Sequence, residues 1–247
     1  MIGPSLPPDF WLAAMAVALA GAVRGFAGFG AGLVMMAPLS LLYGLPAAVV
    51  SVAVIDSVAI PAMLKGVWAI ADRRRALIAA SAAALLLPLG TYILQTSDPQ
   101  LLRQLAGAGV LVFVLALALG WGWRGGEKAA ALIGAGAGVL GGATSLIGPP
   151  VILHFLARGE AAARTRASIA IYISVVVLSQ LIVLALAEEF VGGVAGWSAW
   201  GTALMLAPAY VIGILLGRSV FHLASPLFYR RVAMALLVAV GLLALFG

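Results

Sequence analysis

Two long hydrophobic segments of the chain are each interrupted near the middle by a glycine-rich stretch. The first interruption is RGFAGFGAG at residues 24–32, and the second is GGATSLIGPP at residues 141–150. Helices that break inside a membrane expose backbone groups to which a ligand can bind, and paired breaks in the two halves of a chain are typical of secondary transporters. The pair therefore favours a membrane transport protein.

The composition excludes a water-soluble globular domain. Hydrophobic residues make up 64% of the chain and charged residues 9%, with a mean hydropathy of +1.19. Uncharged runs of about 20 residues are long enough to cross a bilayer as helices. We therefore expect an all-α polytopic membrane protein. The absence of cysteine excludes disulfides and thiolate metal sites.

The hydrophobic residues fall into eight segments, of which six have ordinary spanning length. The two interrupted segments are longer, at 34 and 29 residues. As one helix the longer would measure about 50 Å, against a hydrocarbon core of about 30 Å. We therefore expect both to fold back as hairpins. The segments span residues 10–43, 46–66, 76–94, 102–121, 129–157, 165–187, 197–217 and 230–246.

The basic residues between the segments support a hairpin at residues 129–157. With that hairpin, the loops on one side carry 12 Lys and Arg and those on the other carry 1; if all eight segments cross, the tally is 6 against 7. The positive-inside rule favours the first arrangement, with the C-terminus outside. The charge tally does not decide whether segment 10–43 crosses the membrane or folds back. Only its length and its similarity to segment 129–157 favour a hairpin there. The loops expected in the cytoplasm are 66–75, 122–128, 158–164 and 218–231.

On this topology the chain consists of two inverted repeats, residues 1–121 and 122–247. Each repeat is a broken or re-entrant helical hairpin followed by three transmembrane helices, and an odd number of crossings inverts the second copy. Such symmetry is used for alternating access. An offset of 116 places Gly25 on Gly141 and Gly32 on Gly148. If every segment crosses, the halves are parallel copies instead.

The breaks are the predicted substrate site. A new helix is expected after each break, near Ala31 and near Pro149, and two helix starts at the membrane midplane offer N–H groups and partial positive charge to an anion. The alternative is that the glycines only allow close helix packing. The predicted substrate-binding residues of the breaks are Gly25, Gly28, Gly30, Gly32, Thr144, Ser145, Gly148 and Pro149.

Arg24 is the most informative single residue. It is the only one of the 14 Lys and Arg that lies well inside a hydrophobic segment, directly before the first break. A charge at that depth is a hypothesis of a functional site, because burying it is costly without a partner. A guanidinium also matches the oxygens of an oxyanion. The alternatives are that Arg24 pairs with Asp56 or snorkels to the interface.

Three further residues are candidates for the transport mechanism. Asp56 lies in the second hydrophobic segment and could carry a coupling proton, balance Arg24 or make a structural contact. Tyr172, equivalent to Asp56 by the offset of 116, could donate to the substrate or simply pack between helices. His154 is a second candidate for proton coupling, although a packed or interfacial histidine is the commoner case.

The sequence gives no support to an enzyme or to a bound cofactor or metal. It contains no HExxH, GxSxG or Walker-type motif, and its two histidines are 68 residues apart. Transport is therefore expected to use an ion gradient or to be passive. The basic residues lie in loops between helices, so the pI of about 10.3 indicates orientation in the lipid bilayer and not nucleic-acid binding.

Two motifs together resemble the sulfite exporter TauE/SafE family. They are GxxxGFxGFGxG with a following Gly-Leu-Pro turn, between Gly21 and Pro46, and GxxGG leading into SLIGPPVILHFLARG, between Gly138 and Gly159. The resemblance implies a secondary transporter of sulfite, thiosulfate or an organosulfonate in a prokaryotic cytoplasmic (inner) membrane, coupled to protons. Exporters and importers both occur in the family. Ala31 stands at the middle of a stretch where three consecutive glycines are common in the family.

Other functions remain open at this stage. A permease for a cation or an amino acid would depend on Asp56 and the carbonyl ends of the broken helices. A permease for another small organic anion is a further alternative. An anion channel would conduct without saturation, and a structural subunit would tolerate mutation of the site. The expected partners are a small anionic substrate and the lipid bilayer, and a homodimer is compatible with them.

Overall fold

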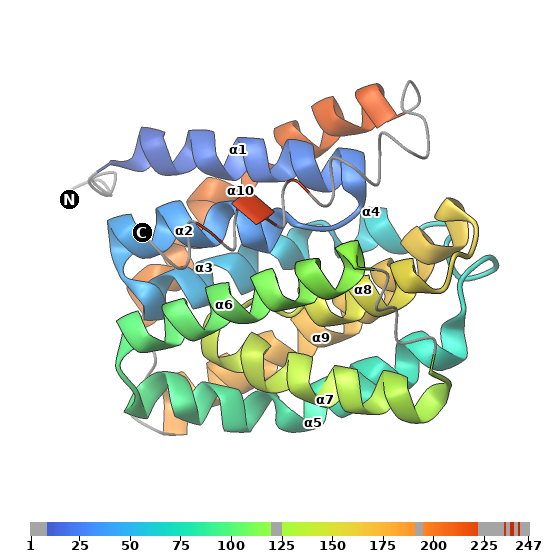
Figure 1. The fold of residues 1–247 in the computed structure, drawn as a ribbon. Helices are drawn as coiled ribbons and strands as arrows, with labels where there is room; N and C mark the ends of the chain where they lie inside the picture. The colour runs from blue at the N-terminus through green and yellow to red at the C-terminus, as the bar shows by residue number, and fades with distance from the viewer. Residues whose placement is uncertain are drawn as a thin grey trace, which may run out of the picture.

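The computed structural model describes residues 9–119, 125–190 and 195–221, together with residues 235, 238, 239 and 242. Within these residues every regular element is an α-helix (Figure 1). The helices are α1 (Phe10–Ala27), α2 (Ala31–Tyr43), α3 (Leu45–Val58), α4 (Ile60–Leu64), α5 (Arg73–Thr96), α6 (Pro99–Ala118), α7 (Glu127–Thr144), α8 (Pro149–Ala157), α9 (Ala162–Phe190) and α10 (Trp197–Phe221).

The helices have the length and surface of a membrane protein. Among the described residues, three helices are long and apolar enough to cross a bilayer, at Arg73–Thr96, Ala163–Glu189 and Trp197–Ser219. Large apolar side chains cover the outside, with Leu85 78% exposed and Leu132 64% exposed. Such a surface suits lipid and not water. The predicted all-α membrane protein is confirmed at this level.

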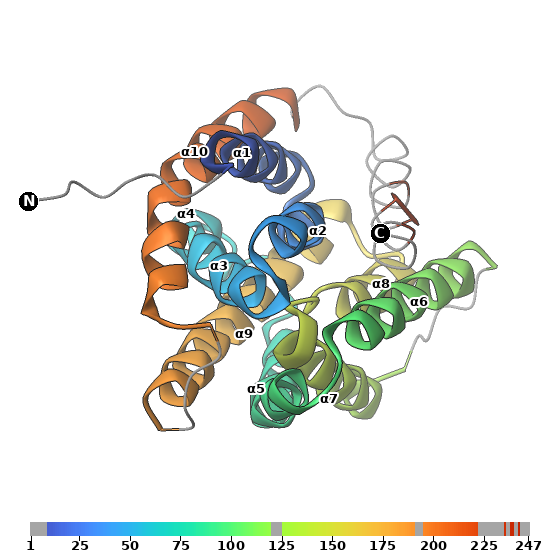
Figure 2. The same cartoon turned by 90° about the vertical axis from the view of Figure 1, so that its left-hand side faces the viewer.

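Both interrupted segments form two helices that fold back on each other at the break. α2 packs against α1, and α8 packs against α7 (Figures 1 and 2). The first helix of each pair ends at a residue in the left-handed region, Gly28 (φ 81°) or Ser145 (φ 58°). That conformation turns the chain out of the helix, and glycine adopts it without the Cβ clash that other residues incur. The breaks therefore lie where the sequence predicts them.

Two helix pairs are packed so closely that their backbones touch. A Cβ on Gly213 or Gly217 of α10 would overlap the backbone of α1 at Ala18 or Ala22, and one on Gly25 would overlap the backbone of α10. The pair α5 and α7 is similar, because a Cβ on Gly138 would overlap Ala83. Small residues allow this close approach in membranes. Helix packing, the alternative explanation for the glycines, thus applies to Gly25.

The segment predicted as one helix over residues 46–66 is divided into α3 and α4 at Ala59. Pro61 has no N–H to donate to the preceding turn, and its ring clashes with the backbone there, so the helix is interrupted just before it. The predicted helix 165–187 corresponds to α9 and 197–217 to α10. Most of the predicted helix 230–246, most of the loop 218–231 and residues 122–124 of the loop 122–128 lie outside the described residues.

Candidate functional site

The two breaks meet around a small buried cavity. Its volume is about 20 Å³, which is enough for about one water molecule. Gly30 and Gly32 line it from the first break, and Ser145 and Gly148 line it from the second. The structure therefore brings together residues that are more than a hundred positions apart in the sequence. The other lining residues are Arg24, Asp56, Leu146, Ile147, Ile152 and Ile173.

Arg24 and Asp56 form a buried ion pair beside this cavity. Nη1 of Arg24, in the last turn of α1, lies 3.5 Å from Oδ2 of Asp56 on α3, and the two residues are 3% and 4% exposed. Tyr210 of α10 donates its hydroxyl to Oδ1 of the same carboxylate. Each charge is compensated by its neighbours, as burial requires. The pairing of Arg24 with Asp56, which the sequence offered as an alternative to substrate binding, is thus present.

The other edge of the Arg24 guanidinium faces a thioether. Nε and Nη2 lie 3.1 Å and 2.9 Å from Sδ of Met63 on α4. A thioether sulfur is a weak hydrogen-bond acceptor. Two of the nitrogens of Arg24 are therefore held much less strongly than a carboxylate or sulfonate would hold them.

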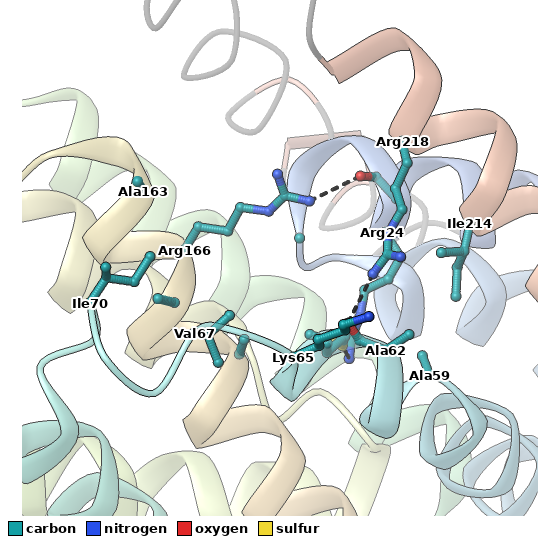
Figure 3. A pocket seen from close by; sticks show the side chains of 15 residues that line it. Arg24, Ala59, Ala62, Lys65, Val67, Ile70, Ala163, Arg166, Ile214 and Arg218 are labelled. Atoms are coloured by element: carbon teal, nitrogen blue, oxygen red, sulfur yellow. Dashed lines mark hydrogen bonds between the residues drawn. The ribbon is translucent and has the colours of Figure 1, made fainter.

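Arg24 also lines a second, larger cavity. Its volume is about 320 Å³, near the lower end of the range for small-molecule sites. Four basic side chains line it, from Arg24, Lys65, Arg166 and Arg218, and no acidic side chain does so among the described residues (Figure 3). The rest of the lining is mainly alanine and larger aliphatic side chains. We call this space the basic cavity, and its chemistry suits an anion with an apolar part.

Two of these arginines also connect the helices around the basic cavity. Arg166 reaches in from α9 and Arg218 from α10 (Figure 3). Nη2 of Arg166 donates to the carbonyl of Gly25 over 3.1 Å, and Nη2 of Arg218 donates to the carbonyl of Ala62 over 3.1 Å. The arginines therefore tie the first break and α4 to the neighbouring helices. In the sequence, both arginines count among the 12 basic residues that indicate the orientation in the membrane.

Gly25 and Gly28 line the basic cavity, next to Arg166. A Cβ on Gly28 would overlap the side chain of Arg166, in addition to the strain of its positive φ. Glycine at this position therefore leaves room for the guanidinium that donates to Gly25. In the first break, Gly25 and Gly28 thus line the basic cavity, while Gly30 and Gly32 line the small cavity between the breaks.

Side chains of α9 provide hydrogen-bond partners for backbone carbonyls and a hydroxyl of the second break. Nε2 of Gln180 donates to the carbonyl of Gly141 over 3.0 Å and lies 3.1 Å from Oγ of Ser145. The Tyr172 hydroxyl donates to the carbonyl of Ile147 over 2.9 Å. Irregular backbone at membrane depth needs such partners. Tyr172 thus contacts the break itself and lines neither cavity among the described residues.

Three other predicted residues lie near the site without lining either cavity. The hydroxyl of Thr144 donates to the carbonyl of Leu140 in its own helix over 2.7 Å. Pro149 is the first residue of α8, followed by Pro150. Neither proline has an N–H, so the start of α8 offers fewer donors to an anion than an ordinary helix start. His154 is buried on α8, with its ring edge-on to Phe155.

The described residues contain no group of three or more His, Cys, Asp or Glu side chains that could hold a metal ion. The polar groups around the breaks are two arginines, a carboxylate, hydroxyls, an amide and backbone groups. This donor set suits direct binding of a small anion to the protein.

The comparisons with known proteins agree with this picture. The family model described as Sulfite exporter TauE/SafE matches residues 13–244, which include both breaks and every residue lining the two cavities. Comparisons with curated proteins and with solved structures gave no match. Because the family match spans nearly the whole chain, the chain belongs to the sulfite exporter TauE/SafE family of membrane transporters.

Proposed function

We propose that the chain is a secondary transporter of a sulfur-containing oxyanion, namely sulfite, thiosulfate or an organosulfonate, which binds between the two broken helices. The observation that carries the proposal is the position of Arg24. Its buried side chain lines both the small cavity between the breaks and the basic cavity. A fixed guanidinium at this point gives a sulfur oxyanion two parallel hydrogen bonds and a balancing charge.

The basic cavity is the proposed entrance on the cytoplasmic side. Lys65 is exposed at its edge, and Arg218 lies in the last turn of α10. Both belong to the side of the chain that carries most of the loop charges, which the positive-inside rule assigns to the cytoplasm. A cavity lined by positive charge concentrates anions and speeds their binding. The conformation described would then be the inward-facing one.

Passage beyond Arg24 requires the two hairpins to move apart. The small cavity holds about one water molecule, so an oxyanion fits there only after rearrangement. Backbone groups at Gly30, Gly32 and Gly148 and the hydroxyl of Ser145 would then contact it, while Tyr172 keeps the second break in shape through the carbonyl of Ile147.

The proposed motion is alternating access between two inverted repeats, residues 1–121 and 122–247. The helix packing supports this symmetry. α1, which begins the first half, packs against α10, the second long helix after the hairpin of the second half. α7 begins the second half and packs in the same way against α5, the second long helix after the hairpin of the first half (Figure 2). Rocking of such equivalent units around a central site is a common transport mechanism.

Asp56 is the proposed proton carrier. One of its oxygens accepts from Tyr210 and the other faces Arg24. An anion that binds to the same guanidinium shares its positive charge with the carboxylate, so substrate and Asp56 are coupled through Arg24. Substrate and proton would then move together. His154, buried on α8, remains a second candidate.

A permease for cations or neutral amino acids is less well supported. Both oxygens of Asp56 already face donors, and the basic cavity would repel a cation. The test is uptake into proteoliposomes of sulfite, thiosulfate, organosulfonates, sulfate and carboxylates, with and without a pH gradient. We expect saturable flux of at least one sulfur anion, stimulated by the gradient. Movement of a carboxylate or amino acid with no sulfur anion would refute the proposal, and flux without saturation would indicate a channel.

A further inference from the structure

The Arg24 guanidinium presents two edges with different partners. Nη1 faces Asp56 at 3.5 Å, whereas Nε and Nη2 both face the single sulfur atom of Met63, at 3.1 Å and 2.9 Å. Nε and Nη2 form the edge that binds the two oxygens of a carboxylate, phosphate or sulfonate in parallel. The thioether therefore lies where the two oxygens of an oxyanion would lie.

We propose that Met63 is a displaceable stand-in for the substrate, so that an oxyanion binds by replacing its sulfur on the Nε and Nη2 edge of Arg24. The proposal rests on the proposed function and adds a specificity-determining residue to it. Asp56 keeps its place on Nη1 and holds the guanidinium in orientation. Substrate binding therefore does not require the buried ion pair to break, which would be costly.

Methionine has the properties that such a stand-in needs. Its sulfur is a weak acceptor, so it covers the guanidinium without competing strongly against a charged oxyanion. Its unbranched side chain has three rotatable bonds and repacks easily. Met63 also lines the basic cavity on the short helix α4. The side chain can therefore turn aside into the space from which the substrate arrives.

The arrangement also selects the class of anion. To displace the sulfur with a net gain in binding free energy, an ion must supply two oxygens at the spacing of Nε and Nη2. A sulfite or sulfonate group does so, whereas chloride is a single sphere and contacts the two donors less well. The apolar lining of the basic cavity, at Ala59, Ala62 and Ile214 among others, accommodates the organic part of a sulfonate.

The test measures sulfite binding to the full-length protein by calorimetry after two substitutions of similar size. Met63→Leu removes the acceptor, so we expect the Kd for sulfite to fall about three- to tenfold. Met63→Gln provides a stronger acceptor to hold the same edge, so the Kd should rise by a similar factor. Met15→Leu, on the exposed side of α1, is the control and should leave the Kd unchanged.

A second measurement does not depend on the variants. In the wild-type protein with methyl-labelled methionine, saturating sulfite should shift the Met63 methyl signal and leave that of Met15 in place. The inference is overturned if wild-type protein binds sulfite while the Met63 signal stays fixed, or if both variants keep the wild-type Kd or change it in the same direction. If the wild type binds none of sulfite, thiosulfate and sulfoacetate, the proposed function fails as well.

Discussion

The guanidinium of Arg24 at the end of α1 lies 3.5 Å from the carboxylate of Asp56 on α3, and both side chains are buried. This contact joins the first broken helix to the helix that follows its hairpin. A buried ion pair is expensive to desolvate. Removal of one member leaves the other charge uncompensated, which destabilises the protein more than replacement of both members by apolar groups. The pair has a structural role and, in the proposed transport mechanism, a functional role, which substitutions can separate.

Loss of one member of the pair should destabilise the protein strongly. Asp56→Ala leaves Arg24 buried without its carboxylate, at an expected cost of about 3–5 kcal/mol. The double variant Arg24→Met, Asp56→Leu replaces both charges by apolar groups and should recover most of that stability while remaining inactive in transport. Thermal unfolding in detergent and sulfite uptake are the two measurements. A double variant as unstable as Asp56→Ala would contradict the pairing.

The charges of the basic cavity should act on the rate of substrate capture. Lys65→Gln removes an exposed charge at its edge, and we expect the KM for sulfite to rise about two- to tenfold at low ionic strength. The difference should shrink in about 0.5 M salt, since exposed charges are screened. Lys128→Gln is a matched control, because Lys128 is exposed on α7 and does not line the basic cavity. Equal effects of the two substitutions would argue against the cavity as the entrance.

Two glycines of α7 provide an internal comparison of helix packing. A Cβ on Gly138 would overlap the backbone of Ala83 on α5, whereas one on Gly136 would meet open space. Gly138→Ala should therefore destabilise the protein by about 1–3 kcal/mol, because the helices must separate. Gly136→Ala should be neutral or stabilise it by up to about 1 kcal/mol through helix propensity. Similar melting temperatures for the two variants would refute the close packing of α5 and α7.

The carboxylate of Asp72, at the N-terminus of α5, should make stability depend on pH. Burial opposes its ionisation, but hydrogen bonds from Arg75 and the charges of Arg75 and Arg158 outweigh burial, so the pKa of Asp72 is lowered. Stability from a lowered pKa is fully present above the unfolded-state value of about 4 and is lost as the pH falls through the folded-state value.

Asp72→Asn keeps a capping oxygen but removes the charge. We expect a lower melting temperature than wild type at pH 7, and a difference that disappears on acidification. Asp98→Asn is the control, because Asp98 caps α6 from an exposed position and its substitution should have a smaller effect. A difference for Asp72→Asn that is the same at pH 7 and at pH 3 would show that its charge does not contribute.

The breaks could be predicted from the sequence because their cause is local. Gly28 and Gly30 adopt positive φ, and a cluster of glycines in a hydrophobic run indicates such a change of direction. Arg24 could be identified for a similar reason, since an arginine in an apolar segment needs a partner whatever the fold. Pro61 divides α3 from α4 through an equally local effect, although the prediction of one helix over residues 46–66 did not use it.

The partners contributed by distant helices could not be predicted in the same way. Tyr210 reaches Asp56 only because α10 packs against α1 and α3. Arg166 and Arg218 line the basic cavity for the same kind of reason, and in the sequence they resemble ordinary loop charges. The hydroxyl of Thr144 was predicted to face the substrate, but it bonds to its own helix. Side-chain direction and helix register depend on tertiary packing, which a single sequence does not record.

The most direct test of an anion site centred on Arg24 is sulfite flux in proteoliposomes containing Arg24→Gln. This substitution keeps most of the bulk and removes the charge and the paired donors. We expect loss of saturable flux, with little recovery in Arg24→Lys, which restores the charge but not the paired geometry. Both variants must first elute as the wild type does in gel filtration. Wild-type flux from correctly folded Arg24→Gln would show that the anion site is not centred on Arg24.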